Sequence, residues 1–107
     1  MNESRVELLE KYIEEEPNEP FNYYALANEY LSSDASKALC LFQSCQDKFP
    51  DYLPTYYQLA KLLEEFEEEN KALEVYQAGI ELAKIQGEHK TINELNTAYQ
   101  NLMFEIE

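Results

Sequence analysis

Residues 23–30 read YYALANEY and residues 56–63 read YYQLAKLL, so the same pattern of tyrosine, leucine and alanine returns 33 positions later. A second pattern, an alanine followed four positions later by an aromatic residue, lies downstream of each copy, at Ala38 and Phe42 and at Ala72 and Tyr76. A weaker third copy of the first pattern follows at Ile92, Leu95 and Tyr99. Self-similarity at such a period is typical of one supersecondary unit stacked on copies of itself.

Apolar residues recur at helical spacing in six stretches of the chain. They predict helices over 4–16, 20–31, 35–48, 53–66, 71–84 and 89–106. Ser4 with Glu7 resembles a capping box, Ser33 or Asp34 is placed to cap the third helix, and Gly87 breaks the chain before the sixth. The turn before the fifth helix is expected at 68–70. Because the connections are short, neighbouring helices should run antiparallel.

The composition favours an all-α domain and argues against polyanions as binding partners. At 107 residues the chain is one domain, with 45% hydrophobic residues and only two glycines and four prolines. Its formal net charge is −14, which argues against nucleic acid and anionic membrane surfaces as partners. The acidity then reflects either the solvation of helix exteriors or a basic partner.

The sequence also predicts a soluble cytoplasmic protein. Cys40 and Cys45 lie five positions apart on one expected helix and point about 140° apart, so they cannot easily bridge each other. Two unpaired thiols are typical of a reducing compartment. The first residues carry no apolar run that would serve as a signal peptide, and no apolar stretch has the length of a membrane span.

The repeated pattern resembles the tetratricopeptide repeat (TPR), a helix–turn–helix of about 34 residues. Its aromatic, leucine, small-residue, tyrosine, alanine, aromatic and proline positions fall in the first copy on Tyr23, Leu26, Ala27, Tyr30, Ala38, Phe42 and Pro50. The corresponding residues of the second copy are Tyr56, Leu59, Ala60, Leu63, Ala72, Tyr76 and, at a further small site, Gly79. The chain departs from the pattern with Tyr23 and Tyr56 in place of tryptophan, Leu63 in place of tyrosine and Lys84 in place of proline.

The resemblance implies a right-handed α-solenoid of antiparallel helix pairs, all-α, with about six helices. It divides the chain as one TPR-like domain over 1–107. Within it we expect a half-repeat at 4–17, the first repeat at 20–50, the second repeat at 53–84 and a capping helix at 89–106.

No residue pattern predicts catalysis, a cofactor or a metal. His89 is the only histidine and stands beside Glu88 in an expected turn. Catalytic and metal-binding histidines need oriented partners, which this one lacks in the sequence. Gly79 and Gly87 are the only glycines, so no glycine-rich phosphate loop exists. The sequence predicts neither catalytic nor cofactor-binding nor metal-binding residues.

The resemblance places a binding groove on the first helix of each pair, which lines the concave wall of such a stack. Side chains about 100° around these helices from the stacked positions should face that groove. The expected groove residues are Phe21, Tyr24, Asn28, Tyr57, Lys61, Glu64, Lys90, Asn93 and Thr97. Alternatively, Tyr24 and Tyr57 only cover the seam between helices.

Aromatic rings flanked by amide and ammonium groups suit a peptide. The sequence therefore predicts a non-enzymatic interaction module or scaffold that binds a protein or peptide of basic or neutral character. Some members of the family clamp a C-terminal carboxylate with several cations, but only Asn28, Lys61 and Lys90 could contribute here, which disfavours that mode. One alternative is a self-associating structural protein, a weak homodimer formed through the Leu8 and Tyr12 side of the opening helix or through the end of the solenoid. The other is an enzyme, for which the sequence shows no site.

Overall fold

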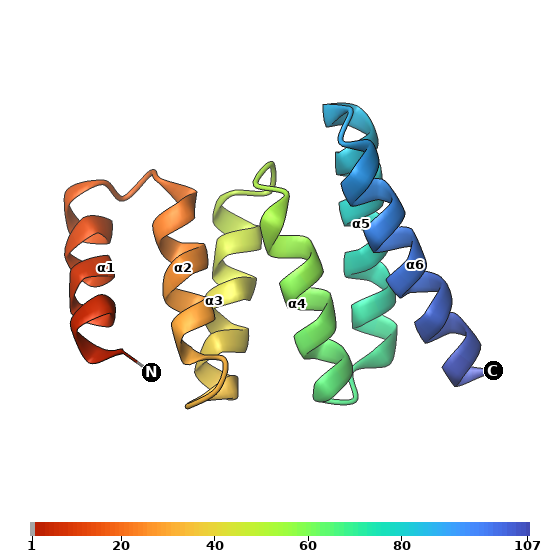
Figure 1. Ribbon diagram of the computed structural model, residues 1–107, viewed down its shortest axis with the longest axis horizontal. Helices are drawn as coiled ribbons and strands as arrows, with labels where there is room; N and C mark the ends of the chain where they lie inside the picture. Colours follow the sequence, from red (N-terminus) through yellow and green to blue (C-terminus); the bar gives the residue numbers. More distant parts are fainter. Residues whose placement is uncertain (1) are drawn as a thin grey trace. The chain divides into compact units, whose positions relative to one another are not determined.

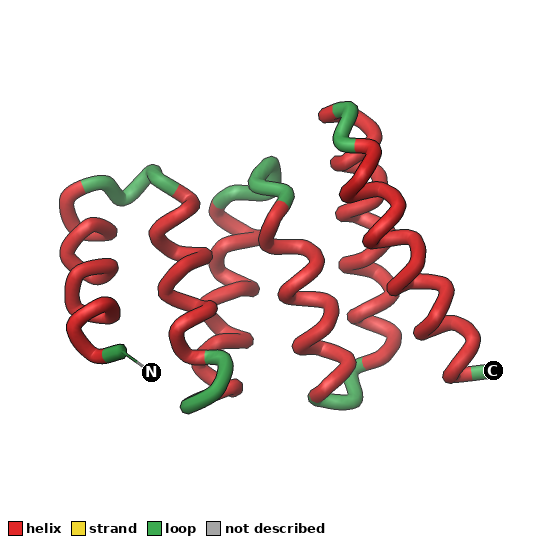
Figure 2. Tube along the Cα trace, in the orientation of Figure 1, coloured by secondary structure: helices red, strands yellow, loops and turns green. Residues whose placement is uncertain are grey.

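The computed structural model describes residues 2–107, and the regular structure in this part of the chain is entirely α-helical (Figure 1). The prediction of an all-α fold with six helices is confirmed for these residues. Short loops join the helices (Figure 2). In chain order the helices are α1 (Glu3–Glu15), α2 (Pro20–Tyr30), α3 (Ala35–Lys48), α4 (Pro54–Glu65), α5 (Glu69–Gln86) and α6 (His89–Ile106).

The predicted bounds hold for α3 and α6, while two details at other helix ends are corrected. The capping box expected at Ser4 does not form, because α1 starts earlier and the Asn2 side chain accepts a hydrogen bond from the Arg5 amide at 3.0 Å. Residues 69 and 70, expected in a turn, belong to α5. The turn before α5 instead uses Glu67 with a φ of 60°, a left-handed conformation uncommon for glutamate.

Two other predicted boundary signals act as expected. The Asp34 carboxylate caps α3 by accepting a hydrogen bond from the Lys37 amide at 3.1 Å. Gly87 ends α5 in the left-handed region, with a φ of 71°, and its amide donates to the carbonyls of Ala83 and Lys84. Glycine adopts this conformation without the steric penalty that other residues meet.

The residues form two compact units, and the boundary between them falls after Thr55, just inside α4. In the first unit α1 packs on α2, α2 packs on α3, and the chain reverses at each loop (Figure 1). Between α1 and α2 the core contains Val6, Leu9, Ala25 and Leu26. Ala27, Ala38, Phe42 and Cys45 are fully buried. The small side chains of Ala27 and Ala38 let helices approach closely, and the large ring of Phe42 fills the core.

Cys45 takes part in a buried polar contact inside the first unit. Its Sγ lies 3.3 Å from Oγ1 of Thr55, another side chain with no exposed surface, so the two form a buried hydrogen bond. Burial raises the pKa of the Cys45 thiol, and the hydrogen bond with Thr55 opposes that shift only in part. The thiol therefore stays protonated and acts as a small core residue.

In the second unit α5 and α6 lie side by side (Figure 1). The large buried side chains of this unit include Leu59, Tyr76, Leu95 and Leu102, each with at most 2% of its surface exposed. Gly79 of α5 is packed so closely against Tyr56 of α4 and Leu95 of α6 that a Cβ at that position would meet both side chains. Glycine is thus required there by space and not by backbone conformation.

Candidate protein-binding site

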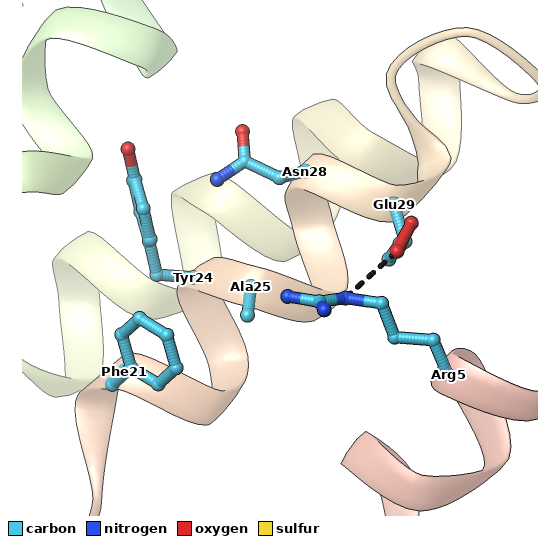
Figure 3. A pocket seen from close by; sticks show the side chains of 6 residues that line it. All are labelled: Arg5, Phe21, Tyr24, Ala25, Asn28 and Glu29. Carbon is cyan, nitrogen blue, oxygen red and sulfur yellow. Dashed lines mark ion pairs between the residues drawn. The ribbon is translucent and has the colours of Figure 1, made fainter. Parts of the chain in front are cut away.

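A hollow on α2 brings together three of the residues expected to bind a partner. Its volume is about 240 Å³, and we call it the α2 hollow. Its lining residues are Arg5, Phe21, Tyr24, Ala25, Asn28 and Glu29. In Figure 3, Tyr24 and Asn28 rise on the same side of α2, with the Phe21 ring next to Tyr24. Spacings of three and four residues place these side chains one above another on the helix.

Tyr24 supports the core and also lines the hollow. Its ring makes edge contacts with Phe42 and Tyr52, at centroid distances of 5.9 and 5.8 Å. Aromatic pairs in this geometry stabilise beyond the area that they bury. Phe21 differs, because 51% of its surface is exposed and it can be covered by a partner. Within the hollow, Tyr24 is therefore the fixed wall and Phe21 the exposed apolar group.

An ion pair at the edge of the hollow was not expected from the sequence. Arg5 reaches from α1 to α2, where its Nε lies 2.8 Å from Oε1 of Glu29 (Figure 3). The sequence argument considered only the first helix of each repeat, and Arg5 lies on the helix before it. One signal was available: Arg5 is one of only two cationic residues in α1. The pair neutralises the guanidinium charge beside Ala25 and Asn28.

The expected site residues of α4 form a second group, in the second unit. Tyr57 is 37% exposed, and Nζ of Lys61 lies 3.9 Å from Oε2 of Glu64. The same carboxylate oxygen accepts a hydrogen bond from the buried Tyr76 hydroxyl. Glu64 is thus held in place by α5, and it partly offsets the charge of Lys61.

The remaining expected residues lie on α6. Lys90, Asn93 and Thr97 are all exposed, and their spacing places them along one stripe of that helix. Their part in binding stays a prediction.

Tyr76 gives the second unit a pH dependence that can be measured. Burial, and next the hydrogen bond to Glu64, raise the pKa of Tyr76 well above its usual value. A raised pKa in the folded state stabilises the fold below the unfolded pKa of about 10, and this contribution is lost as the pH rises further. Tyr76→Phe should cost about 1.5–3 kcal/mol at pH 7, because a hydrogen bond to a charged group is lost.

This variant should also lose less stability than the wild type between about pH 9 and 11, because it lacks the Tyr76 hydroxyl, whose raised pKa makes the stability of the wild type fall in this range. Urea unfolding followed by circular dichroism at both ends of that range measures the difference. Tyr12→Phe, at an exposed tyrosine, is the control and should follow the wild type. Parallel pH curves for Tyr76→Phe and the wild type would contradict the assignment.

Two other features are absent from residues 2–107. None of the helices within residues 2–107 combines the length and apolar character that crossing a membrane requires. No group of three or more histidine, cysteine or acidic side chains in this same range is arranged to hold a metal ion.

Known structures identify the fold family. No protein-family model matches the sequence, and no curated protein matches it. Among solved structures, the solution structure of a tetratricopeptide repeat domain protein from Salinibacter ruber is 42% identical, with a TM-score of 0.76, over 81% of this chain and 89% of that one. A crystal structure described as a tetratricopeptide repeat domain protein from the same organism is 41% identical, with a TM-score of 0.77, over 79% of this chain and 97% of that one.

A more distant neighbour matches more of the chain. The TPR2B domain of yeast Sti1, solved as a complex with pHsp70, has a TM-score of 0.83 at 17% identity, over 94% of this chain and 81% of that one. At this identity the likeness concerns the fold alone. The two Salinibacter ruber structures are 42% and 41% identical to this chain and are matched over 89% and 97% of their own length, so the chain belongs to the tetratricopeptide repeat family.

Proposed function

We propose that this protein is an interaction module that binds a segment of another protein, with the α2 hollow as its anchoring site. The observation that carries the proposal is the grouping of Phe21, Tyr24 and Asn28 around one hollow. A half-exposed phenylalanine next to a fixed tyrosine offers apolar contact area, and the Asn28 amide can bond a peptide backbone. The repeat divisions at 4–17, 20–50, 53–84 and 89–106 are part of the same proposal.

The partner segment is neutral or basic at the point of contact. Arg5, which lines the α2 hollow, and Lys61, an expected contact residue of α4, each lie beside a glutamate. Little positive charge is therefore left to attract a carboxylate, and the chain as a whole carries 22 acidic against 8 basic residues. An acidic segment would be repelled. Yeast Sti1 TPR2B is solved with pHsp70, and we propose that this chain likewise uses the fold to bind a segment of another protein.

The test measures binding to a partner first identified by crosslinking and capture from the host. Phe21→Ala and Asn28→Ala should each weaken binding by about 1–2 kcal/mol, the scale of an interface hot spot, while the fold is retained. Tyr24→Phe keeps the ring contacts with Phe42 and Tyr52 and removes only the hydroxyl group. Tyr57→Ala and Lys61→Ala extend the test to the residues of α4. Isothermal titration calorimetry gives the affinities, and circular dichroism checks the fold.

The matched control is Phe104→Ala, which removes a phenylalanine that is 82% exposed on α6. It should bind the partner as the wild type does. If Phe21→Ala, Asn28→Ala and Phe104→Ala all bind equally well, the α2 hollow is not the site.

Self-association is a second candidate, because α1 exposes two large apolar side chains. Leu8 and Tyr12 are 45% and 41% exposed. Pairing of this face with a second copy would cover both residues. Sedimentation equilibrium over a range of concentrations distinguishes the candidates, since a monomer at all concentrations would leave only the interaction module.

A further inference from the structure

A second hollow lies on the opposite side of α2 from the first. Its volume is about 540 Å³, and it is framed by α1, α2 and α3 within the first unit. We call it the α1–α3 groove. On α2 it is lined by Tyr23 and Leu26, whereas Tyr24 and Asn28 line the α2 hollow. At 100° per residue these two pairs lie on opposite faces of the helix. A ligand of one hollow therefore leaves the other free.

The floor of the α1–α3 groove is apolar and held in place by the core. Ile13 and Leu41 are both half-buried and pack against the α1–α2 core that includes Leu26. Tyr23 is fixed at its tip, where its hydroxyl donates to the carbonyl of Pro17 at 2.8 Å and accepts from Lys48 at 3.1 Å. These contacts make the floor a formed surface that needs little rearrangement to accept a side chain.

The rim of the groove is negative. Glu7, Glu10 and Glu14 all line it from α1, and their spacing of three and four residues places them along one stripe. Among residues 2–107, no lysine or arginine lies within ion-pair distance of these three carboxylates. Lys11 also lines the groove, but its Nζ lies 4.0 Å from Glu15. An apolar floor thus lies beside three uncompensated negative charges.

We propose that the α1–α3 groove is a second docking surface, for a peptide segment that carries an aliphatic side chain between lysine or arginine side chains. The aliphatic group fits against Ile13 and Leu41, and the cations lie opposite the glutamate stripe of α1. Charge complementarity of this kind favours one partner and raises its rate of association. A second copy of this chain is a poor occupant, because its net charge is −14. This surface is separate from the α2 hollow and does not depend on it.

The probe is a dye-labelled, end-capped synthetic peptide in which leucines alternate with pairs of lysines. Two control peptides keep its length, one with glutamate for every lysine and one with serine for every leucine. Fluorescence anisotropy should show binding of the first peptide alone, and binding should weaken when salt rises from about 50 to about 300 mM. Equal binding of the glutamate peptide, or none by the lysine peptide at low salt, would overturn the proposal.

Paired variants locate the site. Glu10→Gln/Glu14→Gln should weaken binding of the lysine peptide about three- to tenfold, as expected for two exposed ion pairs. The matched control Glu74→Gln/Glu94→Gln removes the same charge from exposed positions of α5 and α6 and should change affinity much less. Equal losses in the two variants would show attraction to net charge alone and would overturn the proposal.

Ile13→Ser tests the apolar floor and should also weaken binding, with circular dichroism as the check on folding. Amide shift changes in the NMR spectrum of the wild type should map to α1 and α3, which keeps the test valid if Ile13→Ser unfolds. Phe21→Ala should bind the probe normally. Loss of the probe in Phe21→Ala would place it in the α2 hollow, which contradicts this inference and leaves the proposed function standing. The proposal would also be overturned if the protein formed a dimer that persisted in Glu10→Gln/Glu14→Gln and prevented the probe from binding.

Discussion

Replacing Phe42 by alanine should lower the free energy of unfolding by about 3–5 kcal/mol, the largest loss that we expect from a single change in the first unit. The ring has no exposed surface, so its removal leaves an enclosed space in the core. The loss combines the transfer free energy of the ring with the cost of a cavity. A protein of this size has a total stability of roughly 5–15 kcal/mol, so the variant should be close to unfolding at ambient temperature.

Urea unfolding followed by circular dichroism measures this loss. The control is Phe21→Ala, which should cost less than about 1 kcal/mol because that ring is 51% exposed. Similar losses for the two variants would mean that Phe42 is not part of the core.

Replacing Phe42 should also affect binding at the α2 hollow. Its ring supports Tyr24, and Tyr24 forms the fixed wall of the hollow. Phe42→Leu keeps most of the volume and should cost less than Phe42→Ala. It nevertheless removes the aromatic edge contact, so the partner should bind Phe42→Leu more weakly than the wild type while the fold is retained.

Gly79→Ala should destabilise the second unit by about 1–3 kcal/mol, although alanine is the better helix former by about 1 kcal/mol. The new Cβ would lie 2.8 Å from Cβ of Tyr56 and 3.1 Å from Cδ1 of Leu95. The first of these atoms is attached directly to the backbone of α4, so a side-chain rotation cannot relieve the overlap. Helices α4 and α5 would have to move apart.

Gly87 is the matched comparison, since an added Cβ there meets no atom within 4 Å but the φ is 71°. Gly87→Asn should be nearly neutral, because asparagine tolerates the left-handed region. Gly79→Asn should cost more than Gly79→Ala. Thermal unfolding of these three variants distinguishes destabilisation caused by lack of space from destabilisation caused by backbone conformation. A Gly79→Ala protein more stable than the wild type would contradict the packing described here.

Much of the fold could be predicted because helical periodicity is a local property of the sequence. Asp34 and Gly87 mark helix ends with residue types that suit those positions, and the starts of α3 and α6 that follow them were predicted correctly, whereas α5 runs two residues beyond its predicted end at 84. The turn before α5 was misplaced because Glu67 takes a conformation that sequence signals assign to glycine or asparagine. At α1, Asn2 and Ser4 are both good capping residues, and the sequence alone does not decide which one caps.

Only the part of the candidate site that lies on a single helix could be predicted from the sequence. Phe21, Tyr24 and Asn28 share a face of α2 by their spacing alone. Arg5 could not be found in this way, because its distance from Glu29 depends on how α1 packs against α2 and on a long flexible side chain. The α1–α3 groove was missed for the same reason, since three helices contribute to it. The grouping of the α4 and α6 residues with those of α2 stays a prediction.

Because Cys45 is buried, the rate at which its thiol is labelled can report the rate at which the first unit opens. Thiol reagents attack the thiolate, and burial both covers this sulfur and raises its pKa. Cys40, on the same helix, is exposed and should react in the folded protein. Cys45 should react only after α3 separates from the start of α4. With excess reagent, its rate of labelling becomes the rate of that local opening, and Cys40 supplies the reference reaction within the same molecule.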